Sequence, residues 1–66
     1  MNIGVQQEIR NAAHLAHTLS RLAVDYERMA REYPWKADKF IREAEDARGT
    51  GWQWLDHARD LRERYA

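Results

Sequence analysis

Residues 5–33 read VQQEIRNAAHLAHTLSRLAVDYERMAREY, and their apolar residues recur alternately four and three positions apart. The recurring positions are Val5, Ile9, Ala12, Ala16, Leu19, Ala23, Tyr26, Ala30 and Tyr33. A mean spacing of about 3.5 residues marks one face of a helix that packs against a partner helix. The stretch therefore predicts a long amphipathic helix over about residues 3–32, with Asn2 as its N-cap.

The same spacing resumes after Pro34 and predicts a second helix over about residues 35–65. Its recurring positions are Ala37, Phe40, Ala44, Ala47, Gly51, Trp54, Ala58, Leu61 and Tyr65. A residue before proline avoids helical backbone, whereas proline itself fits a first helical turn. Residues 33–35 are thus expected to form a tight turn between two antiparallel helices.

Two glycines in the second half raise the question of whether that helix is continuous. Each glycine costs about 1 kcal/mol inside a helix, and Thr50 with Gln53 fits a capping box that would begin a third helix. The four-three spacing nevertheless crosses Gly49 and Gly51 without losing phase, which two independent helices need not do. We therefore expect an all-α, antiparallel two-helix hairpin, with a kink or break at residues 49–51 as the alternative.

An antiparallel hairpin pairs residues whose numbers have a constant sum, and a sum of 70 mostly places large residues opposite small ones. The resulting pairs are Ala30/Phe40, Tyr26/Ala44, Ala23/Ala47, Leu19/Gly51, Ala16/Trp54, Ala12/Ala58, Ile9/Leu61 and Val5/Tyr65. Such alternation fills an interface without voids or clashes. On this register Gly51 is expected to be small because Leu19 lies against it.

The size of the chain favours self-association. It has 66 residues and no cysteine, and a single domain of this size buries only about 60% of the surface that its unfolded chain exposes. Small domains usually gain stability from disulfides, a metal or oligomerisation. With disulfides excluded, we expect residues 1–66 to form one hairpin domain that dimerises into a four-helix bundle.

Charge and hydropathy limit the other partners. Basic and acidic residues number 11 each, so the formal net charge is zero and favours neither a polyanion nor a membrane surface. No apolar run reaches the roughly 18 residues that span a bilayer, and no signal-peptide pattern opens the chain. A cytoplasmic protein without a membrane partner or a cofactor is expected.

The sequence contains more apolar residues than one helix–helix seam can cover. Those outside the seam include Leu15, Leu22, Met29, Trp35, Ile41, Trp52 and Leu55. Exposed apolar stripes mark interfaces, and tryptophan is a frequent interface anchor. We predict a protein-interaction surface from these seven residues, for a second copy of the chain and for another protein.

The outer face of the first helix is basic. It carries Arg10, His14, His17, Arg21, Arg28 and Arg31. Regularly spaced arginines can contact a phosphate backbone, which makes this face a candidate polyanion-binding surface. The alternative is a solvated face whose arginines pair with flanking acids. Pairs of opposite charge at i, i+4 are expected at Glu27/Arg31, Lys39/Glu43 and Asp60/Arg64.

No catalytic or metal-binding residues are predicted. His14 and His17 lie one helical turn apart, but no third ligand is in register with them. On its own helix His57 can reach only Asp60, and no base is directed at Ser20, the only serine. No Gly-rich phosphate-binding loop is present.

The sequence thus favours a non-enzymatic, homodimeric helical regulator or inhibitor that binds another protein, of a bacterial or phage accessory type. The alternatives are an RNA- or DNA-binding dimer that uses the basic face, and a structural subunit of a larger assembly. In length and topology the chain resembles the small plasmid copy-number regulators, whose paired hairpins form a four-helix bundle that binds RNA loops. No sequence motif is shared with them, so no functional residue is carried over.

Overall fold

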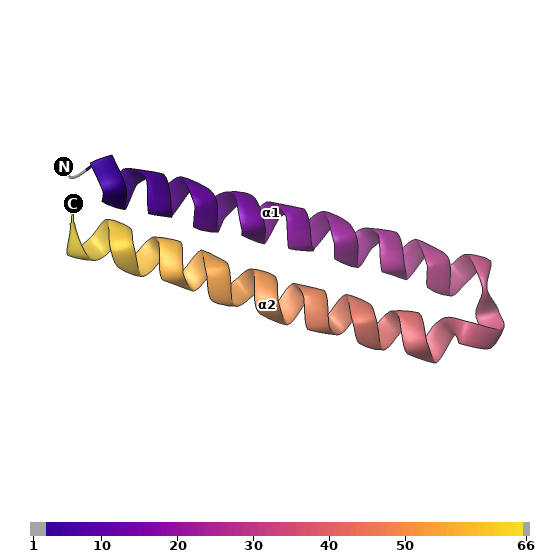
Figure 1. Cartoon of the computed structure of the whole chain (residues 1–66). Coiled ribbons are helices and arrows are strands. Elements are labelled where there is room, and N and C mark those ends of the chain that lie inside the picture. The colour runs from indigo at the N-terminus through magenta and orange to yellow at the C-terminus, as the bar shows by residue number, and fades with distance from the viewer. Residues whose placement is uncertain (1–2, 66) are drawn as a thin grey trace.

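The computed structural model describes residues 3–65, which form two long helices joined by a short turn (Figure 1). Helix α1 spans Ile3–Glu32, the 3₁₀ turn η1 spans Pro34–Lys36, and α2 spans Ala37–Arg64. The helices run antiparallel and side by side, so α1 begins beside the end of α2. No strand occurs among the described residues, and the predicted all-α hairpin is confirmed. The predicted cap at Asn2 lies outside the described residues.

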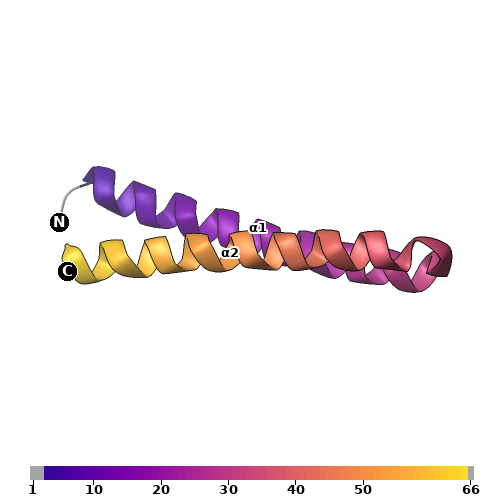
Figure 2. The same ribbon diagram turned by 90° about the horizontal axis from the view of Figure 1, so that it is seen from below.

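The hairpin is long and thin. It measures 50 × 13 × 11 Å. Its Cα radius of gyration is 15.0 Å, against about 11 Å for a compact domain of this length. The helices cross at a shallow angle (Figure 2), as when side chains of one helix fit between those of the other. Neither described helix has a stretch long and apolar enough to cross a membrane.

The turn forms where the proline was expected to place it. Tyr33 has φ −124° and ψ 73°, outside the helical region, because the following Pro34 ring disfavours helical backbone there. The Tyr33 N–H donates to the Met29 carbonyl at 2.8 Å, and the Lys36 N–H donates to the Tyr33 carbonyl at 2.9 Å. Residues 34–36 form a single 3₁₀ turn, so α2 begins at Ala37 rather than near residue 35.

The seam between the helices is lined mainly by alanine. Among residues 3–65, six of the eight buried apolar residues are alanines, and no large side chain is fully buried. Toward the open end the cluster consists of Ile9, Ala12, Ala58 and Leu61, flanked by Val5 and Trp54. Toward the turn it consists of Ala23, Ala44 and Ala47, flanked by Leu19 and Tyr26. Both clusters join residues from the two halves of the repeat, as the register with a sum of 70 requires.

Helix α2 continues through both glycines. It is helical from Ala37 to Arg64, and no glycine among the described residues has a positive φ, so the alternative third helix does not form. A Cβ atom added to Gly51 would lie 3.5 Å from the Ala16 carbonyl oxygen and from the Leu19 Cβ, which is ordinary contact. Leu19 is therefore the neighbour that was expected, but the space accommodates a methyl group, and only a larger side chain is excluded.

Substitutions at the two glycines should separate helix propensity from packing. Gly49→Ala and Gly51→Ala should each raise the free energy of unfolding by about 1 kcal/mol, because both positions are helical. Gly49→Leu should also be tolerated, since nothing lies within 4 Å of its added Cβ. Gly51→Leu should lower the free energy of unfolding by about 1–3 kcal/mol through overpacking. Urea denaturation measures all four variants; equal effects of leucine at both sites would contradict the packing of Gly51.

Candidate interaction surfaces

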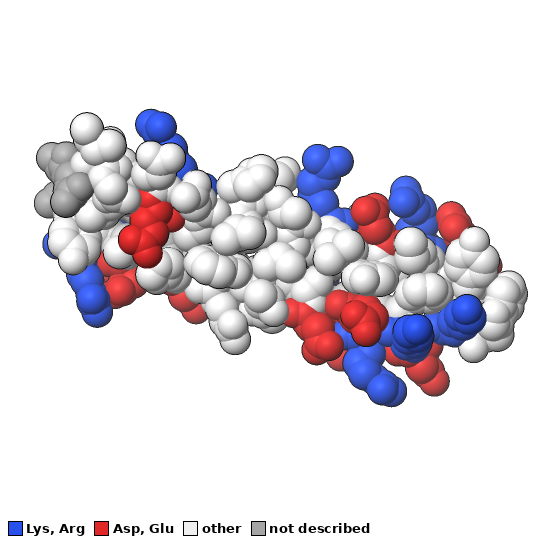
Figure 3. All heavy atoms as spheres, viewed as in Figure 1, with Lys and Arg blue, Asp and Glu red and all other residues white. Residues whose placement is uncertain are grey.

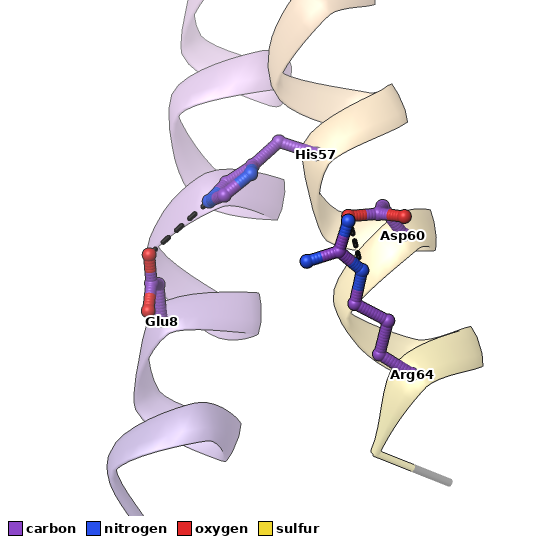
Figure 4. Close-up of polar contacts among 4 residues, drawn as sticks. All are labelled: Glu8, His57, Asp60 and Arg64. Carbon is purple, nitrogen blue, oxygen red and sulfur yellow. Dashed lines mark hydrogen bonds and ion pairs between the residues drawn. The ribbon is translucent and has the colours of Figure 1, made fainter.

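Within residues 3–65, two polar side-chain contacts bridge the helices, one on each side of the seam. In a heptad repeat the seam residues occupy positions a and d, and the flanking positions g and e lie on opposite sides. Glu8 and His57 directly precede the a residues Ile9 and Ala58, so both occupy g. The Glu8 Oε1 lies 3.2 Å from the His57 Nε2 (Figure 4). We call this side of the hairpin the g side.

The opposite side is marked by the ion pair between Glu27 and Arg48. These residues directly follow the d residues Tyr26 and Ala47, so both occupy e. We call this the e side. The side chains of both cross-helix contacts are 40–58% exposed, and exposed polar pairs stabilise a fold only weakly. These contacts therefore show how the two helices are aligned but contribute little to the stability of the hairpin.

The predicted apolar residues of α1 lie on the g side. Leu15, Leu22 and Met29 follow Glu8 at successive intervals of seven and share its heptad position. Leu15 and Leu22 are each 40% exposed, and Met29 is half-buried. An open hollow on this side is lined by Thr50, Gln53, Trp54 and His57.

The predicted apolar residues of α2 lie on the e side or next to it. Ile41 and Leu55 flank Arg48 at intervals of seven and are 46% and 41% exposed. Trp52 lies one turn before Leu55 and is 62% exposed. Trp35 belongs to neither side, because it lies at the turn, where it is 75% exposed and contacts the Tyr33 ring edge-on. The seven predicted interface residues thus form two opposite surfaces and an isolated tip.

The predicted basic face is present on α1 but includes an acid. All six of its residues are exposed. Arg28 pairs with Asp25 at 3.3 Å, as expected if the arginines pair locally with flanking acids. A hollow on this face is lined by His14, His17, Thr18, Arg21, Leu22 and Asp25. The carboxylate of Asp25 thus offsets part of the positive charge that a polyanion would meet.

Several expected polar pairs differ in the structure. Asp60 pairs with Arg64 at 3.2 Å, as predicted. His57 contacts Glu8 on the facing helix rather than Asp60 on its own (Figure 4). Glu27 likewise reaches Arg48 on α2 in place of Arg31. In both cases a neighbour on the facing helix competes with the residue one turn away.

The remaining predicted pair, Lys39 with Glu43, is absent from the ion pairs of the described residues. Residues 3–65 contain no group of three His, Cys, Asp or Glu side chains placed to hold a metal ion. The histidines on the outer face of α1 therefore have no further ligand beside them within this range.

Comparison with known protein families, curated proteins and solved structures found no match. The likeness to copy-number regulators is one of length and topology only. On the face of the molecule in Figure 3, uncharged atoms cover the middle, and charged groups gather toward the ends and edges.

The assignment of Glu27 and Arg48 to one side can be tested by a double-mutant cycle. Glu27→Gln and Arg48→Gln should show a coupling energy of about 0.2–1 kcal/mol, the usual value for an exposed pair. The coupling should weaken at 1 M salt, where charges are screened within about 3 Å. The measurement is urea unfolding of the wild type, both single variants and the double variant. Glu27→Gln with Arg31→Gln serves as the control, and stronger coupling in that pair would contradict the assignment.

Proposed function

We propose that the hairpin is a non-enzymatic protein-interaction module that associates with a second copy of itself and binds another protein, whose activity it regulates. The observation that carries this proposal is the distribution of apolar side chains. The buried seam consists mainly of alanines, whereas ten large apolar residues in the described part of the chain are exposed. Contiguous exposed apolar surface on a small protein usually marks an interaction site.

The kinds of side chain that are exposed support a protein partner. Trp35 and Trp52 are 75% and 62% exposed, and tryptophan is among the residues that contribute most to protein–protein affinity. On the e side Trp52 is accompanied by Leu55, 41% exposed. A rigid helix face with an aromatic residue and a leucine one turn apart suits a groove or helix on another protein.

The nucleic-acid alternative has weaker support. The six basic residues lie on one face of α1, but Asp25 pairs with Arg28 and also lines the hollow beside Arg21. With zero formal net charge, the chain as a whole has no long-range attraction for a phosphate backbone. Binding along this face would weaken steeply with salt, which distinguishes it from binding through the apolar sides.

Self-association should be visible in the mass of the purified chain. Because each hairpin exposes apolar side chains beside its seam, we expect twice the chain mass of 7.9 kDa at high concentration, falling toward 7.9 kDa on dilution. Multi-angle light scattering across a concentration series measures this. A mass of 7.9 kDa at every concentration would contradict the self-association part of the proposal.

Binding to another protein should depend on the exposed tryptophan of α2. We expect a protein captured from cells of the source organism by the wild-type chain to be lost with Trp52→Glu. Capture should persist with Val24→Glu, the matched control, which places the same charge at a 55% exposed position on the outer face of α1. Quantitative mass spectrometry compares the three captures after nuclease treatment. Equal capture by all three chains would contradict the proposed role of Trp52, and loss of capture on nuclease treatment would favour nucleic acid.

A further inference from the structure

The hairpin exposes more surface than a compact monomer of its mass. Its accessible surface is 5271 Å². A compact monomer of 7.9 kDa has about 4400 Å². The excess of roughly 850 Å² is close to the ~800 Å² that each partner contributes to a standard interface. The elongated hairpin thus leaves enough side-chain surface in water for one standard interface. The two sides of the hairpin are the places available for it.

The two sides differ at the middle of their apolar rows. On the g side of α1, Leu22 lies midway between Leu15 and Met29, so the row is apolar throughout. On the e side of α2, Arg48 lies midway between Ile41 and Leu55. A symmetric dimer repeats the same surface on both copies around a two-fold axis, and the residue on that axis meets its own equivalent.

This symmetry favours the g side. A two-fold axis through Leu22 and perpendicular to α1 places Leu22 against Leu22 of the second copy, and Leu15 against its Met29. The same operation on the e side would place two Arg48 guanidinium groups together, each of them already paired with Glu27 of its own chain. Like charges brought together at an interface weaken association and are a common device against wrong pairings.

The g side also distinguishes two arrangements of the pair of hairpins. On this side α2 presents Glu43, Thr50 and His57, which directly precede the a residues Ala44, Gly51 and Ala58. If α1 packed on α2 of the second copy, the Leu22 row would cover these polar and charged groups and remove water from them, which costs free energy. If α1 packs on α1, the Leu22 rows of the two copies meet each other and the α2 groups stay at the rim. The charged residues Arg21 and Asp25, which line the hollow beside Leu22, then lie next to this contact.

We propose that a second copy of the chain docks on the g side, with α1 packed antiparallel against α1 and the two-fold axis at Leu22. This inference rests on the self-association proposed above and adds its geometry. The e side, with Trp52 and Leu55, stays exposed in such a dimer and available to the other protein.

Single cysteines can test this geometry, because the chain has none of its own. Leu22→Cys should form a cross-linked dimer under mild oxidation, because its thiols meet at the axis. Leu55→Cys is the matched control, since Leu22 and Leu55 are 40% and 41% exposed. A disulfide requires Cα atoms within about 7 Å, so we expect Leu22→Cys to link at least about ten times faster. Helical circular dichroism verifies that both variants fold.

A second pair of variants tests the direction of α1. With the axis at Leu22, position 15 of one copy lies about 21 Å along the helices from position 15 of the other, so Leu15→Cys alone should not link. Leu15→Cys combined with Met29→Cys should link readily, because position 15 of each copy then faces position 29 of the other.

The contrary results are equally distinct. Efficient linking by Leu15→Cys alone would indicate parallel helices, and faster linking by Leu55→Cys than by Leu22→Cys would place the interface on the e side. A dimer by light scattering that none of these variants links would also overturn the geometry. Each of these three results would contradict the proposed geometry but would be compatible with self-association. A mass of 7.9 kDa at every concentration would overturn the geometry and self-association together, while capture through Trp52 has its own readout.

Discussion

The structure depends on the close approach of two helices along a seam of alanine and glycine. Small residues such as Ala23 and Gly51 let the backbones come near each other, and the register follows from fitting large side chains opposite small ones. The same choice limits the stability that the seam provides. Burying a methyl group contributes about 0.8 kcal/mol, against about 1.5–3 kcal/mol for a leucine or isoleucine side chain. A seam built this way aligns the helices well but stabilises them weakly.

Apolar residues that the seam cannot accommodate therefore lie beside it. Four of them are 40–46% exposed, namely Leu15 and Leu22 on α1 and Ile41 and Leu55 on α2. Because these side chains are still partly in water, the hairpin gains only part of the free energy that their full burial would provide. A partner that covers them adds the stabilisation that the seam lacks. In the proposed dimer, the stability of the fold depends on association, because the apolar side chains are divided between the seam and the two outer sides.

Much of the fold could be predicted from the sequence. The four-three spacing gave the helices, Pro34 gave the turn, and the unbroken phase across Gly51 gave a continuous α2. The polar pairs were harder, because Glu27 and His57 each have one candidate on their own helix and another on the facing helix. The distances that decide between these candidates exist only after the helices pack. The division of the apolar residues into two sides was missed, although the signal was present: Leu22 precedes an a residue, whereas Leu55 follows a d residue.

In the proposed dimer, the hairpin draws part of its stability from association with another copy. The most direct test is the thermal unfolding midpoint, followed by circular dichroism from about 1 to 100 μM, because binding that occurs only in the folded state raises the midpoint with concentration. We expect the thermal unfolding midpoint to rise steadily with chain concentration over this range. A midpoint independent of concentration, together with a cooperative transition, would show that the alanine seam suffices by itself and would contradict the account.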